Sequence, residues 1–176
     1  FEGQVGNAGV HLKYLRTDAN VGVGLGVGQT IFNVSGTLAS PNVWTTQEQT
    51  YNDAVELQQD TVLTAGGALT FHRTIGTTGQ YDLTLRAVGT TTLGGAVSGV
   101  DALLSNNTGV TEVKAPILAT SVQMDDAVTL SVSGATVTTS SFQLYNASVT
   151  LQADTELSST GGGEIRFKST VDSDGV

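Results

Sequence analysis

The chain has 176 residues, a formal net charge of −9 and only 13% charged residues. Seven Lys and Arg residues against 16 Asp and Glu residues argue against a nucleic-acid partner, which needs a basic stripe. The chain has no Cys and no apolar run long enough for a membrane-spanning helix. We therefore expect neither disulfides nor membrane insertion.

Residues 1–44 form a Gly-rich segment with strand patterns of its own. Val10 to Arg16 alternates apolar and polar side chains, which predicts a strand. Val21 to Gly28 reads VGVGLGVG, and a strand there would place four glycines on one face. Such a face predicts either close approach of another backbone or sheet, or a linker or tight corner. Ile31 to Leu38 resumes a strand pattern. We expect 1–44 to serve in assembly or capping.

An internal repeat begins after this segment. Tyr51 to Thr64 reads YNDAVELQQDTVLT, and Tyr145 to Ser158 reads YNASVTLQADTELS. The two copies lie 94 residues apart (145 − 51) and share 8 of 14 positions. Asp126 to Leu130 matches Asp53 to Leu57 at a shorter offset of 73 residues (126 − 53). Repetition of this kind is typical of stacked or arrayed architectures.

Short alternating runs recur through the rest of the chain, separated by turns rich in Gly, Asn, Asp and Thr. No segment carries an apolar period of a helix over three turns, so we expect almost no helix. The predicted inward positions are Val55, Leu57, Leu69, Phe71, Leu83, Leu85, Val110, Val128, Leu130, Val149, Leu151, Ile165 and Phe167.

Two all-β architectures fit this pattern. One is a parallel β-helix, or β-solenoid, with coils of roughly 20 residues stacked at about 4.8 Å. The other is a tandem of β-sandwich domains of roughly 90 residues each. The 94-residue offset suits both, but the second, shorter offset favours coils, because a solenoid can restart its motif after any whole number of coils. We therefore predict a β-solenoid repeat region over 45–176, with tandem β-sandwiches as the alternative.

Three stretches of the chain resemble repeats of very large bacterial exported proteins. They are Gln49 to Val55, Asp60 to Thr64 and Thr90 to Val97. The resemblance is to the filamentous-haemagglutinin-like and autotransporter-passenger kind, and it covers roughly residues 45–176. It implies a secreted or surface-attached β-solenoid that serves as an adhesin, stalk or filament. It brings no catalytic residues.

Candidate catalytic residues are few. His11 and His72 are the two histidines, and neither lies in a recognisable nucleophile frame. A polysaccharide lyase would need clustered acidic and basic groups, and Asp53, Asp126 and Arg73 would have to meet through stacking to supply them. We assign no catalytic, cofactor-binding or metal-binding residue and do not expect an enzyme.

Calcium is the one cofactor that the sequence raises. Asp172 to Gly175 resembles part of a calcium loop, but it lacks the third ligand and the closing Glu. Asp125 and Asp126 form a like-charged pair that is a second candidate. We expect ordinary turns at both places.

These observations predict a structural segment of an extracellular or cell-surface bacterial protein. The second repeat copy stops just after Val171 and residue 1 is Phe, so we expect a piece of a longer chain. We expect self-association into a filament or stalk, end to end or through the N-terminal Gly-rich strand. Carbohydrate binding by an adhesin module is the alternative, with a lyase ranked below it. The aromatic platforms for glycans would be Trp44, Tyr51, Tyr81 and Tyr145.

Overall fold

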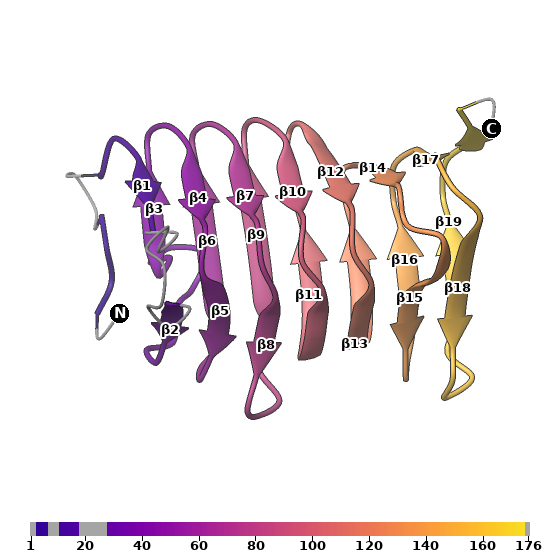
Figure 1. Cartoon of the computed structure of the whole chain (residues 1–176), viewed down its shortest axis with the longest axis horizontal. Helices are drawn as coiled ribbons and strands as arrows, with labels where there is room; N and C mark the ends of the chain where they lie inside the picture. The colour runs from indigo at the N-terminus through magenta and orange to yellow at the C-terminus, as the bar shows by residue number, and fades with distance from the viewer. Residues whose placement is uncertain (1–2, 7–10, 18–27, 175–176) are drawn as a thin grey trace, which may run out of the picture.

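The computed structural model describes residues 3–6, 11–17 and 28–174 (Figure 1). These residues form twenty β-strands, and they contain no helix that could cross a membrane. The strand pattern over Val21 to Gly28, with its glycine face, falls almost wholly on residues 21–27, which lie outside the described residues.

The strands form two sheets in which every pairing is parallel. The eight-stranded sheet contains β1 (Leu15–Arg16), β4 (Gln49–Tyr51), β7 (Leu69–Phe71), β10 (Thr91–Leu93), β12 (Val110–Val113), β14 (Ala127–Leu130), β17 (Val149–Leu151) and β20 (Val171–Ser173). The twelve-stranded sheet contains β2 (Gln29–Phe32), β3 (Val43–Thr45), β5 (Ala54–Leu57), β6 (Thr61–Ala65), β8 (Ile75–Thr77), β9 (Leu83–Ala87), β11 (Val97–Ser105), β13 (Ile117–Met124), β15 (Gly134–Thr139), β16 (Gln143–Tyr145), β18 (Thr155–Ser159) and β19 (Ile165–Phe167).

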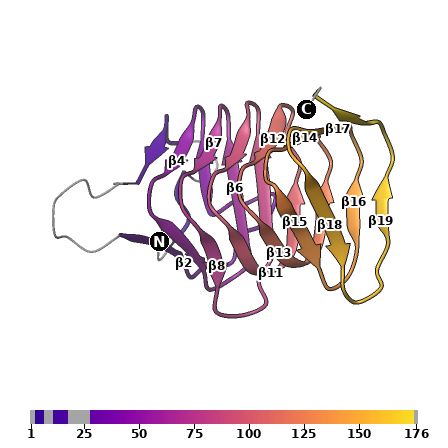
Figure 2. The ribbon, with the colours of Figure 1, turned by 45° about the vertical axis from the view of Figure 1, so that its right-hand side comes forward.

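Each strand pairs with the equivalent strand of the next coil, so the chain winds into a β-solenoid of about 6 turns. Figure 2 shows the coils stacked along one axis. Most coils contribute two strands to the twelve-stranded sheet, but the long strands β11 and β13 each span both positions. The predicted fold is confirmed. Tandem sandwiches are excluded, because their strands pair antiparallel.

The core lies inside the coils, where alternate side chains of both sheets meet. Leu57, Leu63, Leu69 and Leu85 are fully buried there, and burial of a side chain of this size stabilises the fold by about 1.5–3 kcal/mol. Most of the predicted inward positions are confirmed.

Val110 is an exception to these predictions. It is half-buried, and its neighbours Thr111 and Val113 point inward instead. Thr111 pairs in register with the buried Val128, so Thr111 is an inward position of β12. Side chains alternate along a strand, and Val110, the first residue of β12, therefore does not point inward. Leu151, Ile165 and Phe167 are also only partly buried, because they lie in the last two coils of the described residues.

The two copies of the sequence repeat lie on different faces of the solenoid. Tyr51 belongs to β4 in the eight-stranded sheet, whereas Tyr145 belongs to β16 in the twelve-stranded sheet. The expectation that the motif restarts after a whole number of coils is therefore wrong. From residue 49 onward, coil length varies from 17 residues between the paired positions Thr111 and Val128 (128 − 111) to 22 between Leu69 and Thr91 (91 − 69). The repeated unit is a strand–turn–strand element, which fits more than one face.

Glycines stand where neighbouring coils touch at the corners. A Cβ on Gly95 would lie 2.1 Å from the main-chain carbon of Arg73, and one on Gly109 would lie 2.4 Å from the carbonyl oxygen of Gly89. These distances are below any van der Waals contact, so only glycine allows the coils to stack this closely here.

The described parts of residues 1–44 continue the same stack. β2 pairs with β5, β3 pairs with β6, and single bridges join Val5 to Val43 and Leu12 to Thr45. The predicted strand over Val10 to Arg16 is reduced to β1, and the one over Ile31 to Leu38 ends at Phe32. A role of 1–44 in assembly or capping stays a prediction.

Candidate functional site

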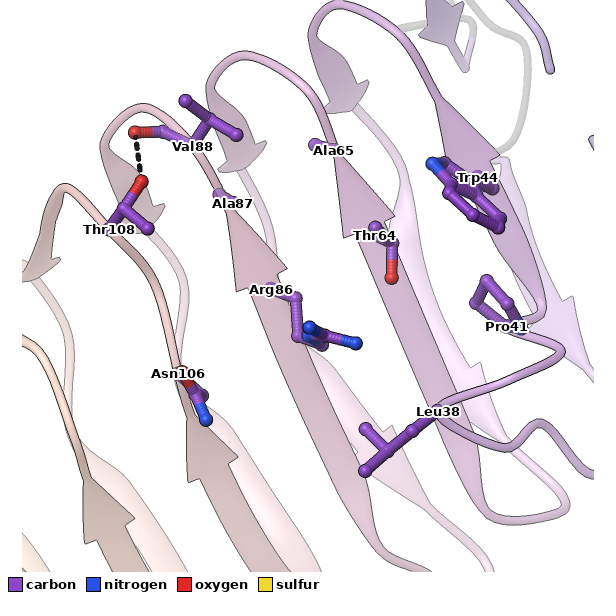
Figure 3. Close-up of a pocket in the computed structure, with 10 residues that line it drawn as sticks. All are labelled: Leu38, Pro41, Trp44, Thr64, Ala65, Arg86, Ala87, Val88, Asn106 and Thr108. Atoms are coloured by element: carbon purple, nitrogen blue, oxygen red, sulfur yellow. Dashed lines mark hydrogen bonds between the residues drawn. The ribbon is translucent and has the colours of Figure 1, made fainter.

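A groove of about 270 Å³ lies on the outer face of the twelve-stranded sheet, beside the segment that joins β2 to β3 (Figure 3). Leu38 and Pro41 of that segment form one wall. Trp44 of β3, Thr64 of β6 and Arg86 of β9 lie next to one another in register, one on each of three successive coils. The remaining lining residues are Ala65, Ala87, Val88, Asn106 and Thr108.

Arg86 is the only charged residue that lines the groove, and its side chain is exposed. Within the part of the chain that the structure describes, the one ion pair joins Lys114 to Glu112, at 2.6 Å. The Arg86 guanidinium therefore has no carboxylate partner among these residues. A cation without a partner beside an aromatic ring is a site that can receive a ligand from solution.

Thr64 occupies the centre of the groove. Its side chain is short, so a notch opens between the larger Trp44 and Arg86 side chains on either side of it (Figure 3). The Thr64 Oγ1 atom is buried without a hydrogen-bond partner. Figure 3 shows this hydroxyl pointing into the space between Arg86 and Pro41. A buried hydroxyl without a partner is uncommon, and it marks a place where a partner is missing.

Trp44 is held in place by a residue of the N-terminal segment. The His11 ring stacks on the Trp44 ring, with centroids 3.9 Å apart and an angle of 24° between the planes. His11 Nδ1 also lies 3.4 Å from the carbonyl oxygen of Gly6. His11 thus supports one wall of the groove. His72 is exposed on another part of the surface.

Two of the four predicted glycan platforms are wrong. Tyr51 and Tyr145 are fully buried, so neither can stack on a ligand. Tyr81 is half-buried and does not line the groove. Trp44 alone of the four lines it.

The two buried tyrosines belong to matching polar clusters. The Tyr51 hydroxyl donates to Gln49 Oε1 at 3.0 Å, and Gln49 Nε2 donates to the carbonyl oxygen of Thr64 at 2.7 Å. Burial raises the pKa of Tyr51 far above its usual value. Its ring stacks on Phe71 with centroids 5.0 Å apart. This arrangement is structural, because every polar atom named here has an internal partner.

These clusters could have been found by extending the comparison of the two repeat copies to the residues before Tyr51 and Tyr145. Thr45 and Thr139, and likewise Gln49 and Gln143, are identical residues at the same 94-residue offset as the tyrosines. The quoted repeat begins only at Tyr51 and so leaves these positions out.

Asp126 is also a structural residue. Its carboxylate is buried and accepts hydrogen bonds from Thr111 Oγ1 at 2.6 Å and from Asn107 Nδ2 at 3.1 Å. Asn107 Nδ2 also donates to Ser105 Oγ at 2.7 Å, and Asn107 Oδ1 accepts from the Ala87 N–H at 2.6 Å. The cluster joins three coils inside the solenoid.

The residues that a lyase would need do not gather. Asp53 and Arg73 lie in neighbouring coils at the corner between β4 and β5 and between β7 and β8, respectively. Asp126 lies at the corner between β13 and β14, where the chain passes in the other direction from the twelve-stranded to the eight-stranded sheet. The stacking therefore does not bring the three side chains together.

The acidic turns considered for calcium are partnered by amides. Asp125 Oδ1 accepts from Gln123 Nε2 at 2.8 Å and from Asn146 Nδ2 at 2.5 Å. Asp174 Oδ2 accepts from Gln152 Nε2 at 3.2 Å. Among the described residues, no three His, Asp or Glu side chains come together as a metal-ligand set.

A column of acidic residues lies just before the first residues of β6 and β9. The Asp82 N–H donates to Asp60 Oδ1, and the Ala102 N–H donates to Asp82 Oδ1, both at 3.0 Å. Partial burial raises the pKa of Asp82, and the charges of Asp60 and Asp101 raise it further, while the Ala102 hydrogen bond opposes them. The Asp60 and Asp82 carboxylates thus each accept a hydrogen bond from a main-chain N–H of the next coil.

No family model, no curated protein and no solved structure matches the chain. The resemblance to bacterial exported repeat proteins is supported only as far as the β-solenoid fold.

Proposed function

We propose that this chain is a structural segment of an extracellular bacterial surface protein, and that copies of it stack end to end into a stalk or filament. The proposal has no catalytic component. Its mechanism is the continuation of the two sheets from one copy into the next, so that the strands at one end of a solenoid pair with those at the other end of its neighbour.

The observation that carries the proposal is the exposure of Phe167 in the last coil. Phe167 stacks on Tyr145 with centroids 5.0 Å apart, as Phe71 stacks on Tyr51. Phe71 is 1% exposed because the next coil covers it, whereas Phe167 is 38% exposed. An apolar ring at the end of an open sheet favours a further coil above it.

The register of the solenoid supplies a partner for this end. Residues that pair in register from one coil to the next form rows along the solenoid. One row runs from Arg16 through Thr50 to Asp172, and another runs from Val5 through Val43 to Phe167. If a second copy continues the same rows, Asp172 of one copy lies beside Arg16 of the next, and Phe167 lies on Val5. Opposite charges and apolar side chains would then meet in register.

Assembly is tested with charge exchange between the two ends. We expect sedimentation and electron microscopy to show rods that lengthen with protein concentration. Arg16→Glu and Asp172→Arg should each shorten them, because each places like charges together. The combined variant should restore them. Asp101→Arg, which changes the charge in the middle of the solenoid, is the matched control and should assemble as the unchanged protein does.

A monodisperse single rod at all concentrations contradicts the stacking of copies. Equal shortening by Arg16→Glu, Asp172→Arg and the combined variant contradicts the proposed register, since the combined variant recreates the opposite-charge pair.

Carbohydrate binding is a second candidate function, favoured by the position of Trp44 in the groove beside an unpaired guanidinium. Binding sites for small ligands combine an aromatic or apolar surface with a few polar groups that fix orientation, and this groove has both. Titration of the protein with simple sugars tests it directly.

A further inference from the structure

We infer that the groove binds a sugar that carries a carboxylate, with the carboxylate on Arg86 and the sugar ring against Trp44. This inference rests on the second candidate function and names its ligand class. It does not depend on the end-to-end assembly of copies.

Charge selects an acidic ligand. The protein has a net charge of −9, yet the lining of the groove holds one cation and no carboxylate. Arg86 has no ion-pair partner within the described residues. A guanidinium binds a carboxylate through two parallel hydrogen bonds, which fixes orientation as well as charge.

The spacing of the row fits a ring with a carboxylate at its edge. Trp44 and Arg86 are two strands apart, and neighbouring strands lie about 4.8 Å apart, so their main chains are separated by roughly 10 Å. Thr64 lies between them and leaves the notch open. The exposed Asn106 amide at the far side offers hydrogen bonds to hydroxyl groups.

The size of the groove and the charge beyond it favour a short or terminal residue over a long acidic chain. Sites for small ligands have volumes of roughly 300–1,000 Å³, and this groove, at about 270 Å³, is just below that range. The row continues from Asn106 to Asp125 in the next coil. Asp125 would repel a second carboxylate there, so a polyanion cannot follow the row without a cost.

Trp44 provides the readout, because it is the only Trp of the chain. We would titrate the purified protein with methyl glucuronoside and with its neutral counterpart methyl glucoside, following the Trp fluorescence. Methyl glucoside carrying a 6-sulfate serves as the comparison anion. We expect saturable binding of the glucuronoside, with the glucoside and the sulfate at least about tenfold weaker.

Variants separate the carboxylate contact from the rest of the groove. Arg86→Gln should bring the glucuronoside down to the affinity of the glucoside. Thr64→Phe fills the notch and should abolish binding of both while Arg86 remains. Arg166→Gln removes an exposed arginine on β19, away from the groove, and should change nothing. Thermal unfolding of each variant confirms that it is folded.

The outcomes distinguish the two claims. If glucoside and glucuronoside bind equally well to the unchanged protein, the groove binds sugars but the carboxylate inference is overturned. If the sulfate binds as tightly as the glucuronoside, the commitment to a carboxylate is overturned as well. If no sugar binds, both the inference and the second candidate function are overturned.

Discussion

Gln49 and Gln143 make the same hydrogen bonds from two different faces of the solenoid. The Nε2 atom of each donates to a main-chain carbonyl oxygen, of Thr64 at 2.7 Å and of Ser158 at 2.8 Å. The Oε1 atom of each accepts from a tyrosine hydroxyl two residues later. Each amide thereby joins its own strand to a later one through the interior, where both glutamines are fully buried.

The tyrosines of these two clusters predict loss of stability at high pH. Burial raises the pKa of Tyr51 and of Tyr145 far above the unfolded value of about 10, because the phenolate is disfavoured inside the core. The stabilisation is complete below the unfolded pKa and declines as the pH rises above it. The free energy of unfolding should fall by about 1.4 kcal/mol per pH unit for each tyrosine.

Denaturant unfolding at several alkaline pH values measures this slope. Tyr51→Phe and Tyr145→Phe should each be less stable at neutral pH, by about 1–3 kcal/mol, because a glutamine oxygen loses its donor. Each should also have a shallower slope above pH 10. Slopes equal to that of the unchanged protein would contradict the claim that these tyrosines cause the loss of stability at high pH.

Two threonines paired in register should respond oppositely to loss of the hydroxyl. Thr91 and Thr111 are fully buried neighbours in the eight-stranded sheet. Thr91 Oγ1 has no hydrogen-bond partner, whereas Thr111 Oγ1 donates to Asp126 at 2.6 Å. Thr91→Val should be neutral or stabilising by up to about 1 kcal/mol, and Thr111→Val should destabilise by about 2–3 kcal/mol. Midpoints of urea unfolding compare the two, and equal effects would contradict the hydrogen-bond pattern.

Glycine at a coil corner should be indispensable, whereas glycine within a strand should not. A Cβ on Gly95 would overlap the Arg73 backbone, but one on Gly76 would meet only Ser98 Oγ at 3.8 Å. Gly95→Ala should destabilise by about 3 kcal/mol, because the coils must move apart. Gly76→Ala, the matched control, should be neutral or stabilising by about 0.5 kcal/mol. Thermal unfolding decides, and tolerance of both substitutions would mean that the corner can relax.

Asp82→Asn should stabilise the protein at neutral pH. The amide oxygen still accepts from the Ala102 N–H, while repulsion from Asp60 and Asp101 disappears. The effect should be about 0.5 kcal/mol or less, since the site is exposed and screened. The folded-state pKa of Asp82 is raised, so the unchanged protein gains stability relative to the variant as the pH falls through that pKa. Melting temperatures from pH 7 to pH 3 should therefore converge, and a constant difference would contradict this account.

The fold was predictable because the inward residues repeat. Runs such as Leu69 and Phe71 mark strands wherever they occur. The second offset between copies favoured coils on a premise that the structure contradicts, because the motif does not restart after a whole number of coils. The face on which each strand lies was not predictable, because the coils from residue 49 onward vary between 17 and 22 residues and so have no fixed period. Tyr51 and Tyr145 show the consequence: their equivalent positions in the repeat come with matching hydrogen bonds but not with a shared sheet.

The groove was predictable only through Trp44. Arg86 and Asn106 lie in runs with no unusual composition, and they reach Trp44 solely because the register aligns their coils. The residues of such a row are about 20 positions apart in the sequence, so no short sequence motif contains two of them. The wall made by Leu38 and Pro41 likewise depends on the path of the segment after β2.

The unequal match between repeat and coil has a consequence for the outer surface. The repeat of 94 residues does not correspond to a whole number of coils. If a chain is lengthened by one more repeat, the added copy therefore lies on a different face of the solenoid. Outward residues carried by every copy, such as the exposed Asp60 and Asp154, are then displayed around the rod in a winding stripe. A partner that recognises one copy would meet the next only after turning about the axis.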